Sequence, residues 1–359
     1  MLENDKSLHK FLISTPARIV GNYRSGDVSI DISFPEDDSM LNYQDSPHSR
    51  TFLIVTISVP PVTYPEVIFG VNQSFHGEIF SSLLSLVYGK EFKYHGLLES
   101  YGLYKLPNMN NEANSLYYLP FFNSSPRKDL EIPLNLEKFG LIEPLIINNN
   151  ASVTDEFSQK IIATGKFYNR AIRMLPREPE LAYLDLITCG EMISSFYDDD
   201  FTEEELYDEK LMKSLEQIKT LENGESIAKD IKNRLYQVKR KFTAALLKNL
   251  NDEFFSKTET INNVGRIHKV AAEKLIKKGY DLRSLYVHTG ADFSEFIIPR
   301  KGINNEIQVF TPAHETDKKL ANVISDSPSF LGLERIIRFS LLSLINANGV
   351  PIDSRLKNT

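Results

Sequence analysis

The second half of this chain is organised around the segment Tyr280–Gly290, whose sequence is YDLRSLYVHTG. The segment carries an arginine and a histidine with four residues between them, a pattern written R-x4-H. Its composition favours a helix, and Gly290 can adopt the left-handed conformation that ends helices. A helical region precedes it, and no other catalytic motif in the sequence competes with it. These features predict a helical bundle that presents an arginine and a histidine.

On a straight helix, Arg283 and His288 would flank one face rather than share it. Successive helical residues are about 100° apart, so five positions separate the two by roughly 140°. Ser284 and His288 are four positions apart and do share a face. His288 would lie in the last turn, where the helix dipole favours its protonated form. A histidine that titrates near neutral pH suits acid–base chemistry, and a permanently charged arginine suits a phosphate. The alternative is a solvated surface arginine and a histidine that caps the helix.

Length and composition indicate an ordinary globular protein. The 359 residues are enough for two domains and a sizeable core, and 25% of them are charged and 42% hydrophobic. The single cysteine, Cys189, excludes a disulfide within the chain and a cysteine-based zinc site. The first residues lack the basic and then apolar pattern of a signal peptide. No apolar run is long enough to span a bilayer. We therefore expect a cytoplasmic protein without a membrane partner.

Charge is unevenly distributed along the chain, whose net charge is −7. Residues 1–150 contain 11 Lys and Arg against 17 Asp and Glu, and residues 151–359 contain 30 against 31. The segment Lys229–Arg283 contains 14 basic and 6 acidic residues and ends at the R-x4-H pattern. A basic surface of this kind suits RNA, although lysine-rich helix faces are often simply solvated.

Residues 1–150 are expected to be β-rich. Val28–Phe34 alternates apolar and polar residues, as a half-buried strand does, and Phe52–Val59 is a β-branched run that suits a buried strand. Phe75–Tyr88 is expected to form a helix, and Phe92–Lys105 a hairpin that turns at one of its glycines, Gly96 or Gly102. No catalytic motif is apparent in this half.

The run Asn148–Asn150 is interpreted as the domain boundary, because the hydrophobic period becomes helical after it. The first helix is expected to be capped by Ser152 or Thr154. A second helix is expected over Glu180–Phe196, and Thr202 with Glu205 matches a capping box.

Ser226–Leu250 is predicted to be one long helix with an apolar stripe. Lys232, Lys239 and Arg240 lie on its opposite face and are the expected RNA-binding residues. Further helices are expected over Val264–Lys278 and Leu333–Ile345.

Three segments of the C-terminal half resemble a HEPN domain, in particular the Apea-like branch associated with prokaryotic defence. Phe167–Leu175 is similar to the first helix of that family, and Glu180–Glu191 to its second, which closes on an acidic residue. Leu282–Gly290 is similar to its R-x4–6-H motif. The resemblance covers roughly residues 150–350. The expected fold class is therefore α+β, with a β-rich α/β domain in residues 1–150 and an α-helical HEPN bundle in residues 151–359.

The resemblance implies a metal-independent endoribonuclease that works as a homodimer, with the motif helices of two subunits lining one cleft. By position, His288 would be the acid–base residue, Arg283 would stabilise the phosphate, and Glu191 would orient Arg283. Ser284 stands where many members carry Asn, Asp or His, which leaves its supporting role open. Leu282, Leu285 and Tyr286 are expected to help seal the dimer.

Some forms of control and chemistry are not expected. Members that a partner antitoxin silences by nucleotidyl transfer carry a tyrosine where this chain has Gly290, so that control is not predicted here. No cofactor and no bound metal are expected, and the carboxylates from 198 to 205 are interpreted as a solvated acidic loop rather than a cation site.

Three functions remain open on the sequence. The first is an RNA-cleaving HEPN effector of an anti-phage or toxin-like system, with an N-terminal domain that senses or docks a regulatory partner. The second is a non-catalytic HEPN module for binding or dimerisation. The third makes the N-terminal half the active part and the helical half a dimeriser.

Overall fold

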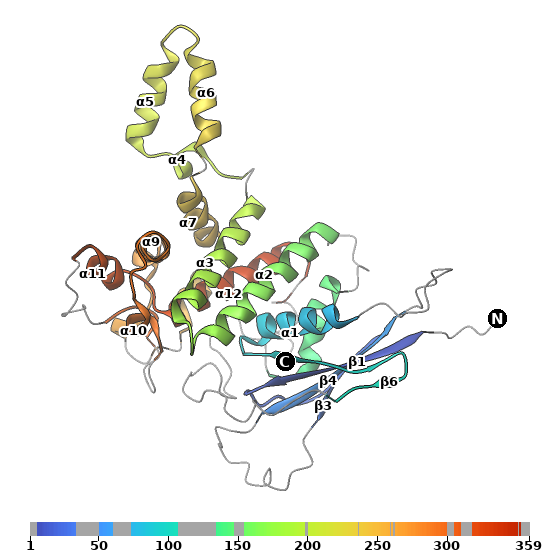
Figure 1. The fold of residues 1–359 in the computed structure, drawn as a ribbon. Helices are drawn as coiled ribbons and strands as arrows, with labels where there is room; N and C mark the ends of the chain where they lie inside the picture. The colour runs from blue at the N-terminus through green and yellow to red at the C-terminus, as the bar shows by residue number, and fades with distance from the viewer. Residues whose placement is uncertain are drawn as a thin grey trace.

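The computed structural model describes residues 6–33, 50–59, 73–106, 134–146, 154–197, 200–235, 237–258, 260, 263–299, 305–309, 318–350 and 352. Within these ranges the fold is α+β. An antiparallel sheet occupies the N-terminal part, and helices make up most of the C-terminal part (Figure 1). The predicted domain boundary at Asn148–Asn150 lies outside the described residues.

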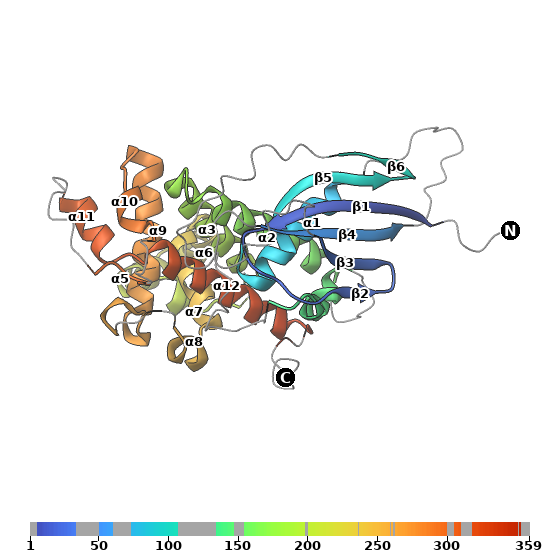
Figure 2. The same ribbon diagram turned by 90° about the horizontal axis from the view of Figure 1, so that it is seen from below.

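The sheet has six strands in the order β2-β3-β4-β1-β5-β6, and every pairing is antiparallel (Figure 2). Their bounds are β1 Ser7–Thr15, β2 Tyr23–Ser25, β3 Val28–Ser33, β4 Thr51–Val59, β5 Lys93–Ser100 and β6 Leu103–Tyr104. The predicted strands at Val28–Phe34 and Phe52–Val59 are thus β3 and β4.

Strand alternation builds one apolar face on the sheet. Phe11 and Ile13 of β1 pair with Val55 and Leu53 of β4, and all four side chains are fully buried. Helix α1 (Ser74–Tyr88) and the 3₁₀ segment η3 (Leu136–Leu145) contribute to the same buried core. The predicted helix at Phe75–Tyr88 is confirmed by α1.

The predicted hairpin in residues 92–105 forms between β5 and β6. Its turn is at Tyr101 and Gly102, where φ is +53° and +75°, so the second of the two candidate glycines marks the turn. Gly96 instead lies inside β5, beside an irregularity in its pairing with β1.

The helical part is built around α2 (Asp155–Met174), α3 (Pro179–Ser194), α7 (Val238–Asn249), α9 (Ala272–Thr289) and α12 (Phe330–Ala347). α2 is capped by Thr154, one of the two caps that the sequence offered, and the Thr154 side chain accepts the N–H of Phe157. The capping box of Thr202 and Glu205 is also present, and it opens the short helix α4 (Glu203–Leu206). The remaining elements are η4 (Ser195–Tyr197), α8 (Asp252–Ser256), η5 (Asn263–Gly265), η6 (Lys269–Ala271), α10 (Ser294–Ile297) and α11 (Lys318–Ser325).

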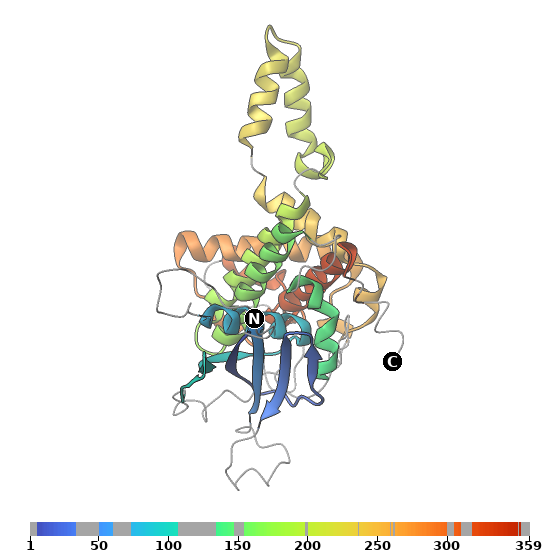
Figure 3. The ribbon, with the colours of Figure 1, turned by 90° about the vertical axis from the view of Figure 1, so that its right-hand side faces the viewer.

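Helices α5 (Glu209–Lys219) and α6 (Gly224–Arg234) form an antiparallel hairpin that projects from the body (Figures 1 and 3). We call this hairpin the arm. Leu215 and Ala228 are buried between its helices, whereas Leu221 near the tip is 62% exposed. The arm therefore stabilises itself largely through its own apolar stripe.

The prediction of one helix over Ser226–Leu250 is wrong. α6 ends at Arg234 and α7 begins at Val238, and between them Gln237 has φ +48°, a conformation that breaks a helix. The apolar stripe is continuous in sequence, but its two parts pack against different helices. α6 packs on α5 in the arm, and α7 packs on α3, α9 and α12 in the body. Hydrophobic periodicity cannot distinguish these two situations.

The predicted helix at Val264–Lys278 is also wrong at its start. Two separate 3₁₀ turns, η5 and η6, lie before α9, which begins at Ala272 and continues through the R-x4-H segment. The motif is therefore the last part of a longer helix. The predicted helix at Leu333–Ile345 is confirmed by α12, which extends beyond it at both ends.

The sheet and the helices share one buried core, which includes residues of both halves. A buried arginine of α12 joins the halves: Arg338, 1% exposed, donates to the backbone oxygens of Leu86 and Val87 at the end of α1. One turn earlier on α12, the buried Glu334 carboxylate accepts the hydroxyl of Tyr168 from α2. α12 thus ties α1 and α2 together through charged side chains.

Candidate active site

Helix α9 carries the residues of the R-x4-H motif and packs against α3, α7 and α11. It buries Leu275, Ile276, Gly279 and Leu282. It ends at Gly290, which has φ +67° and donates its N–H to the backbone oxygen of Tyr286 at 2.8 Å. The predicted left-handed C-cap is confirmed, and the capping hydrogen bond comes from the backbone rather than from His288.

Arg283, Ser284, Val287 and His288 form a strip along the last turns of α9 that spans about 140° of the helix surface, from the partly buried Arg283 to the exposed His288. We call it the motif strip. Arg283 and Ser284 are partly buried, Val287 is 49% exposed and His288 is exposed. In helical projection Ser284 lies about 100° from Arg283, and so between Arg283 and His288. Arg283 and His288 therefore lie about 140° apart on α9 and flank Ser284, as the helical period predicts.

Three residues from two helices meet at one end of the motif strip. The Nη2 atom of Arg283 lies 4.0 Å from Oε1 of Glu191 on α3. The hydroxyl of Tyr280, one turn before Arg283, donates to the same Oε1 at 2.9 Å. The Arg283 guanidinium also lies over the Tyr280 ring, 5.6 Å from its centroid, which is within the range of a cation–π contact. Glu191 thus lies beside Arg283, the residue that it orients according to the resemblance.

The Tyr280 hydroxyl acts as a donor throughout the physiological pH range. Burial is the largest cause that raises the pKa of Tyr280, and the hydrogen bond to the Glu191 carboxylate and its negative charge add to it. Arg283 opposes the shift, and the pKa lies at about 12. Sequence patterns do not indicate this contact, because an aromatic residue at a helical position is interpreted first as core.

His288 stands at the exposed end of the strip. Within the described part of the chain it makes no hydrogen bond or ion pair to another side chain. An exposed imidazole in the last turn of a helix is accessible to a substrate or to a second protein chain. Its exposure suits a proton carrier.

The predicted RNA-binding residues do not form one face. Lys232 lies on α6 and pairs with Glu203 of α4, whereas Lys239 and Arg240 lie on α7. Arg240 pairs with Asp208 at 3.0 Å, and Lys239 pairs with Asp281 of α9 at 2.6 Å. The break between α6 and α7 separates the three residues, and each has a carboxylate partner. Their surface is less basic than the sequence alone indicates.

Lys239 differs from the other two because its partner lies on the motif helix. Asp281, Ser284 and His288 are spaced i, i+3 and i+7, so they share a face of α9. Through its ion pair with Asp281, Lys239 therefore contacts the face of α9 that also carries His288. Lys232 and Arg240 instead pair with residues at or beside α4, at the base of the arm.

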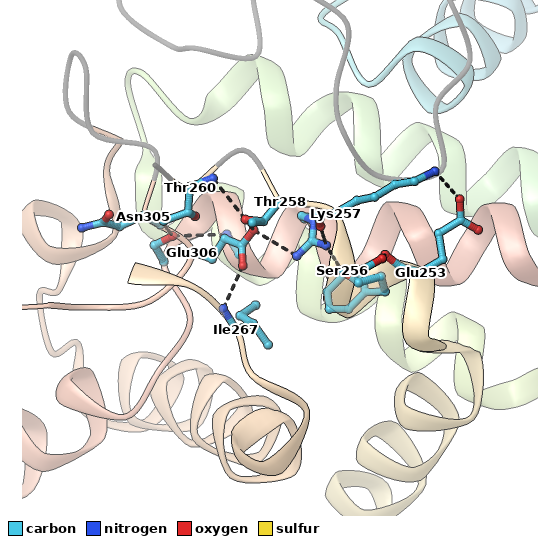
Figure 4. A network of polar contacts seen from close by, with 12 residues as sticks. Glu253, Ser256, Lys257, Thr258, Thr260, Ile267, Asn305 and Glu306 are labelled. Carbon is cyan, nitrogen blue, oxygen red and sulfur yellow. Dashed lines mark hydrogen bonds and ion pairs between the residues drawn. The ribbon is translucent and has the colours of Figure 1, made fainter. Parts of the chain in front are cut away.

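A buried polar network fixes the segment that leads into α9 (Figure 4). The carboxylate of Glu306 accepts the Ile267 N–H at 2.8 Å, an Nη1–H of Arg335 at 3.0 Å, and the hydroxyl of Thr258. Arg335 of α12 also donates to the backbone oxygens of Phe254 and Lys257. Because Glu306 and Arg335 are each about 2% exposed, the network anchors the approach to α9 on the core.

Gly332 allows this anchoring. A Cβ at that position would lie 1.9 Å from the backbone oxygen of Glu306, closer than any side chain permits. One signal for the network is present in the sequence: Glu334, Arg335 and Arg338 interrupt an otherwise apolar final helix. Charged residues inside such a helix indicate buried partners elsewhere in the chain.

A hydrogen-bonded serine and histidine occur in the N-terminal half. Ser14 Oγ lies 2.7 Å from Nε2 of His95, and Arg50 Nε donates to the same Oγ at 2.9 Å. Ser14 is fully buried, so no substrate reaches its hydroxyl. The contact joins β1, β5 and the start of β4 and is best explained as part of the packing of the sheet.

Within the described ranges, no group of three or more His, Cys, Asp and Glu is arranged to hold a metal ion. In the same ranges no helix combines the length and apolar character needed to cross a membrane. Comparison of the chain with protein-family models, curated proteins and solved structures finds no match. The candidate site is therefore identified from its residues and their geometry alone.

Proposed function

We propose that this chain is a metal-independent endoribonuclease of the HEPN type, with Arg283 and His288 as its catalytic residues. The observation that supports this best is the motif strip, where one helix carries an exposed histidine and, five positions before it, a partly exposed arginine beside the Glu191 carboxylate. This arrangement supplies a proton carrier and a fixed positive charge, the two functions that cleavage of an RNA phosphodiester requires.

The proposed reaction uses the ribose 2′-hydroxyl as the nucleophile. A neutral His288 removes the 2′-proton while the 2′-oxygen attacks the adjacent phosphorus. The bond from phosphorus to the 5′-oxygen breaks, and a protonated histidine gives its proton to that oxygen. Arg283 stabilises the charge that gathers on the phosphate oxygens. The products are a 2′,3′-cyclic phosphate and a 5′-hydroxyl.

Two copies of the chain would supply the two proton carriers. If the motif strips of two chains meet, His288 of one copy acts as base and His288 of the other as acid. The residues that were expected to seal this contact do not all suit it, because Leu282 is fully buried and Leu285 and Tyr286 pack on the core of their own chain. Val287, exposed within the strip, is the better candidate for the apolar contact.

The main rival is a HEPN-type module that binds without catalysis. A gel assay of total RNA with the wild-type chain and His288→Ala separates the two functions. Cleavage by the wild type and its loss in the variant supports the nuclease. Binding of RNA without cleavage by either protein would favour the module.

A role as a defence effector, regulated through the N-terminal half, belongs to the same proposal. Expression in a bacterial host tests it, since an active ribonuclease effector arrests growth. We expect arrest with the wild-type chain and normal growth with His288→Ala at equal protein level. Equal growth with both proteins would contradict an effector that is active on its own.

A further inference from the structure

Tyr280 contacts both members of the Arg283–Glu191 pair, and nothing in the proposed reaction requires a tyrosine there. Its hydroxyl donates to Glu191 Oε1 at 2.9 Å, and its ring lies under the Arg283 guanidinium. The same Oε1 atom is the one that faces Arg283, at the longer distance of 4.0 Å. Tyr280 therefore has the closer contact with the carboxylate, and Arg283 the looser one.

Another arginine of the bundle shows what a fully engaged pair looks like. Arg170 of α2 donates through Nε to one oxygen of Asp185 at 2.6 Å and through Nη2 to the other oxygen. This two-bond arrangement occupies one edge of the guanidinium. Arg283 makes no such bond within the described residues, so its N–H groups remain available to an anion.

We propose that Tyr280 is a positioning residue, which holds the Glu191 carboxylate back from Arg283 and so leaves the guanidinium donors available to an RNA phosphate. The inference rests on the proposed function, and it assigns to Tyr280 the role of keeping the N–H donors of Arg283 available. Glu191 still directs the guanidinium by its charge, and the Tyr280 ring limits the guanidinium on one face. Without the hydroxyl, the carboxylate can close on Arg283 in the way that Asp185 closes on Arg170.

The ring and the hydroxyl of Tyr280 can be tested separately. The ring packs against Phe242 of α7, with centroids 5.2 Å apart, and this contact needs no oxygen. Tyr280→Phe therefore keeps the packing and removes the bond to Glu191. Tyr286→Phe is the matched control: this residue lies on the same helix, packs on Phe293 at 5.8 Å, and its hydroxyl makes no side-chain hydrogen bond within the described residues.

The experiment measures cleavage and binding in parallel, with full-length proteins. A fluorescent RNA oligonucleotide gives kcat/KM, and the same oligonucleotide with 2′-deoxy sugars, which cannot be cleaved, gives Kd over a range of salt concentrations. For Tyr280→Phe we expect kcat/KM to fall roughly tenfold, as for the loss of a hydrogen bond to a charged group. We also expect the slope of log Kd against log salt to become flatter by about 0.7, because one phosphate contact is lost on a single strand.

A double-mutant cycle tests whether Tyr280 acts through Glu191. In a Glu191→Gln background the carboxylate is absent, so Tyr280→Phe should have no further effect on cleavage or on the salt slope. Tyr286→Phe should match the wild type in both measurements. The cycle remains decisive if Tyr280→Phe lowers the melting temperature, since a folding defect would persist in the Gln background.

The possible failures are distinguishable. If the wild type cleaves RNA and Tyr280→Phe keeps its full rate and salt slope, the positioning role is wrong and the proposed function stands. An equal loss in both Glu191 backgrounds would likewise overturn a role that acts through Glu191. If the wild type leaves RNA intact, the proposed function is wrong, and the role given to Tyr280 is wrong with it.

Discussion

The Glu191 carboxylate on α3 lies 4.0 Å from the Arg283 guanidinium on α9, and these two residues come from distant parts of the sequence. The contact places a negative charge beside the arginine of the R-x4-H pattern without occupying its donors. A guanidinium held in this way keeps its orientation, and its N–H groups remain able to bind an anion. This relationship and the exposure of the motif strip lead to specific expectations for variants of the chain.

Replacing either Arg283 or His288 with Ala should abolish RNA cleavage and leave the fold intact. Loss of an acid–base group costs on the order of 10² to 10⁴ in rate, and loss of charge stabilisation costs a similar factor. Both residues are at least partly exposed, so the melting temperature should change little. Kinetics on a labelled RNA and thermal melts measure the two effects.

His268→Ala is the matched control for the histidine. This exposed residue precedes η6, and its ring nitrogen lies 3.2 Å from the backbone oxygen of Asn263, away from the motif strip in sequence. Its variant should cleave RNA at the wild-type rate. If His268→Ala loses activity and His288→Ala keeps it, the assignment of the site is wrong.

Val287→Glu should separate the proposed dimer and reduce cleavage strongly. Val287 is 49% exposed in the middle of the motif strip, and a carboxylate there would face its own copy across a two-fold axis. Val270→Glu is the control, because Val270 is 97% exposed ahead of α9 and should tolerate the same change. Light scattering with a parallel cleavage assay measures both variants. A wild-type chain that is monomeric at micromolar concentration and still cleaves RNA would contradict the shared site.

Lys239→Glu should weaken RNA binding and lower its salt dependence. The change removes a positive charge beside α9 and places a carboxylate next to Asp281, whose partner is lost. Lys6→Glu on the distant sheet, where Lys6 pairs with Asp27, is the control and should leave affinity unchanged. Fluorescence anisotropy with a 2′-deoxy oligonucleotide measures the affinities. Equal affinities for wild type and Lys239→Glu would show that Lys239 does not contribute to RNA binding.

Arg335→Met should destabilise the chain by about 3 to 5 kcal/mol, because it leaves the buried Glu306 carboxylate without its cation. Lys257→Met is the control: it breaks an exposed pair with Glu253 on the same part of the chain and should cost less than about 1 kcal/mol. Chemical denaturation gives both free energies of unfolding. A similar, small cost for both variants would show that the network does not anchor the approach to α9.

The sequence predicted those parts of the fold that depend on local patterns. The strands β3 and β4, the helix α1, the caps at Thr154 and Gly290 and the capping box of Thr202 follow from alternation and capping chemistry. The break at Gln237 was not predictable, because the apolar stripe continues across it while its packing partner changes from α5 to the body.

For the candidate site, the positions on α9 were predictable and the contacts were not. The helical period places Ser284 between Arg283 and His288, and the resemblance pointed to Glu191. The hydroxyl of Tyr280, the carboxylate partners of Lys239 and Arg240, and the Glu306–Arg335 pair are long-range contacts. Such contacts depend on how the helices pack against one another. Local sequence patterns do not reveal this packing.

The chemistry of the cut ends tests the proposed nuclease most directly. RNA is digested with the purified chain in excess EDTA, and the new ends are identified by mass spectrometry, with His288→Ala and a DNA of the same sequence in parallel. We predict cleavage of RNA by the wild type alone, with 2′,3′-cyclic phosphate and 5′-hydroxyl ends and intact DNA, because DNA lacks the 2′-hydroxyl nucleophile. Activity that is lost in EDTA and restored by magnesium, or 5′-phosphate ends, would contradict the mechanism assigned to Arg283 and His288.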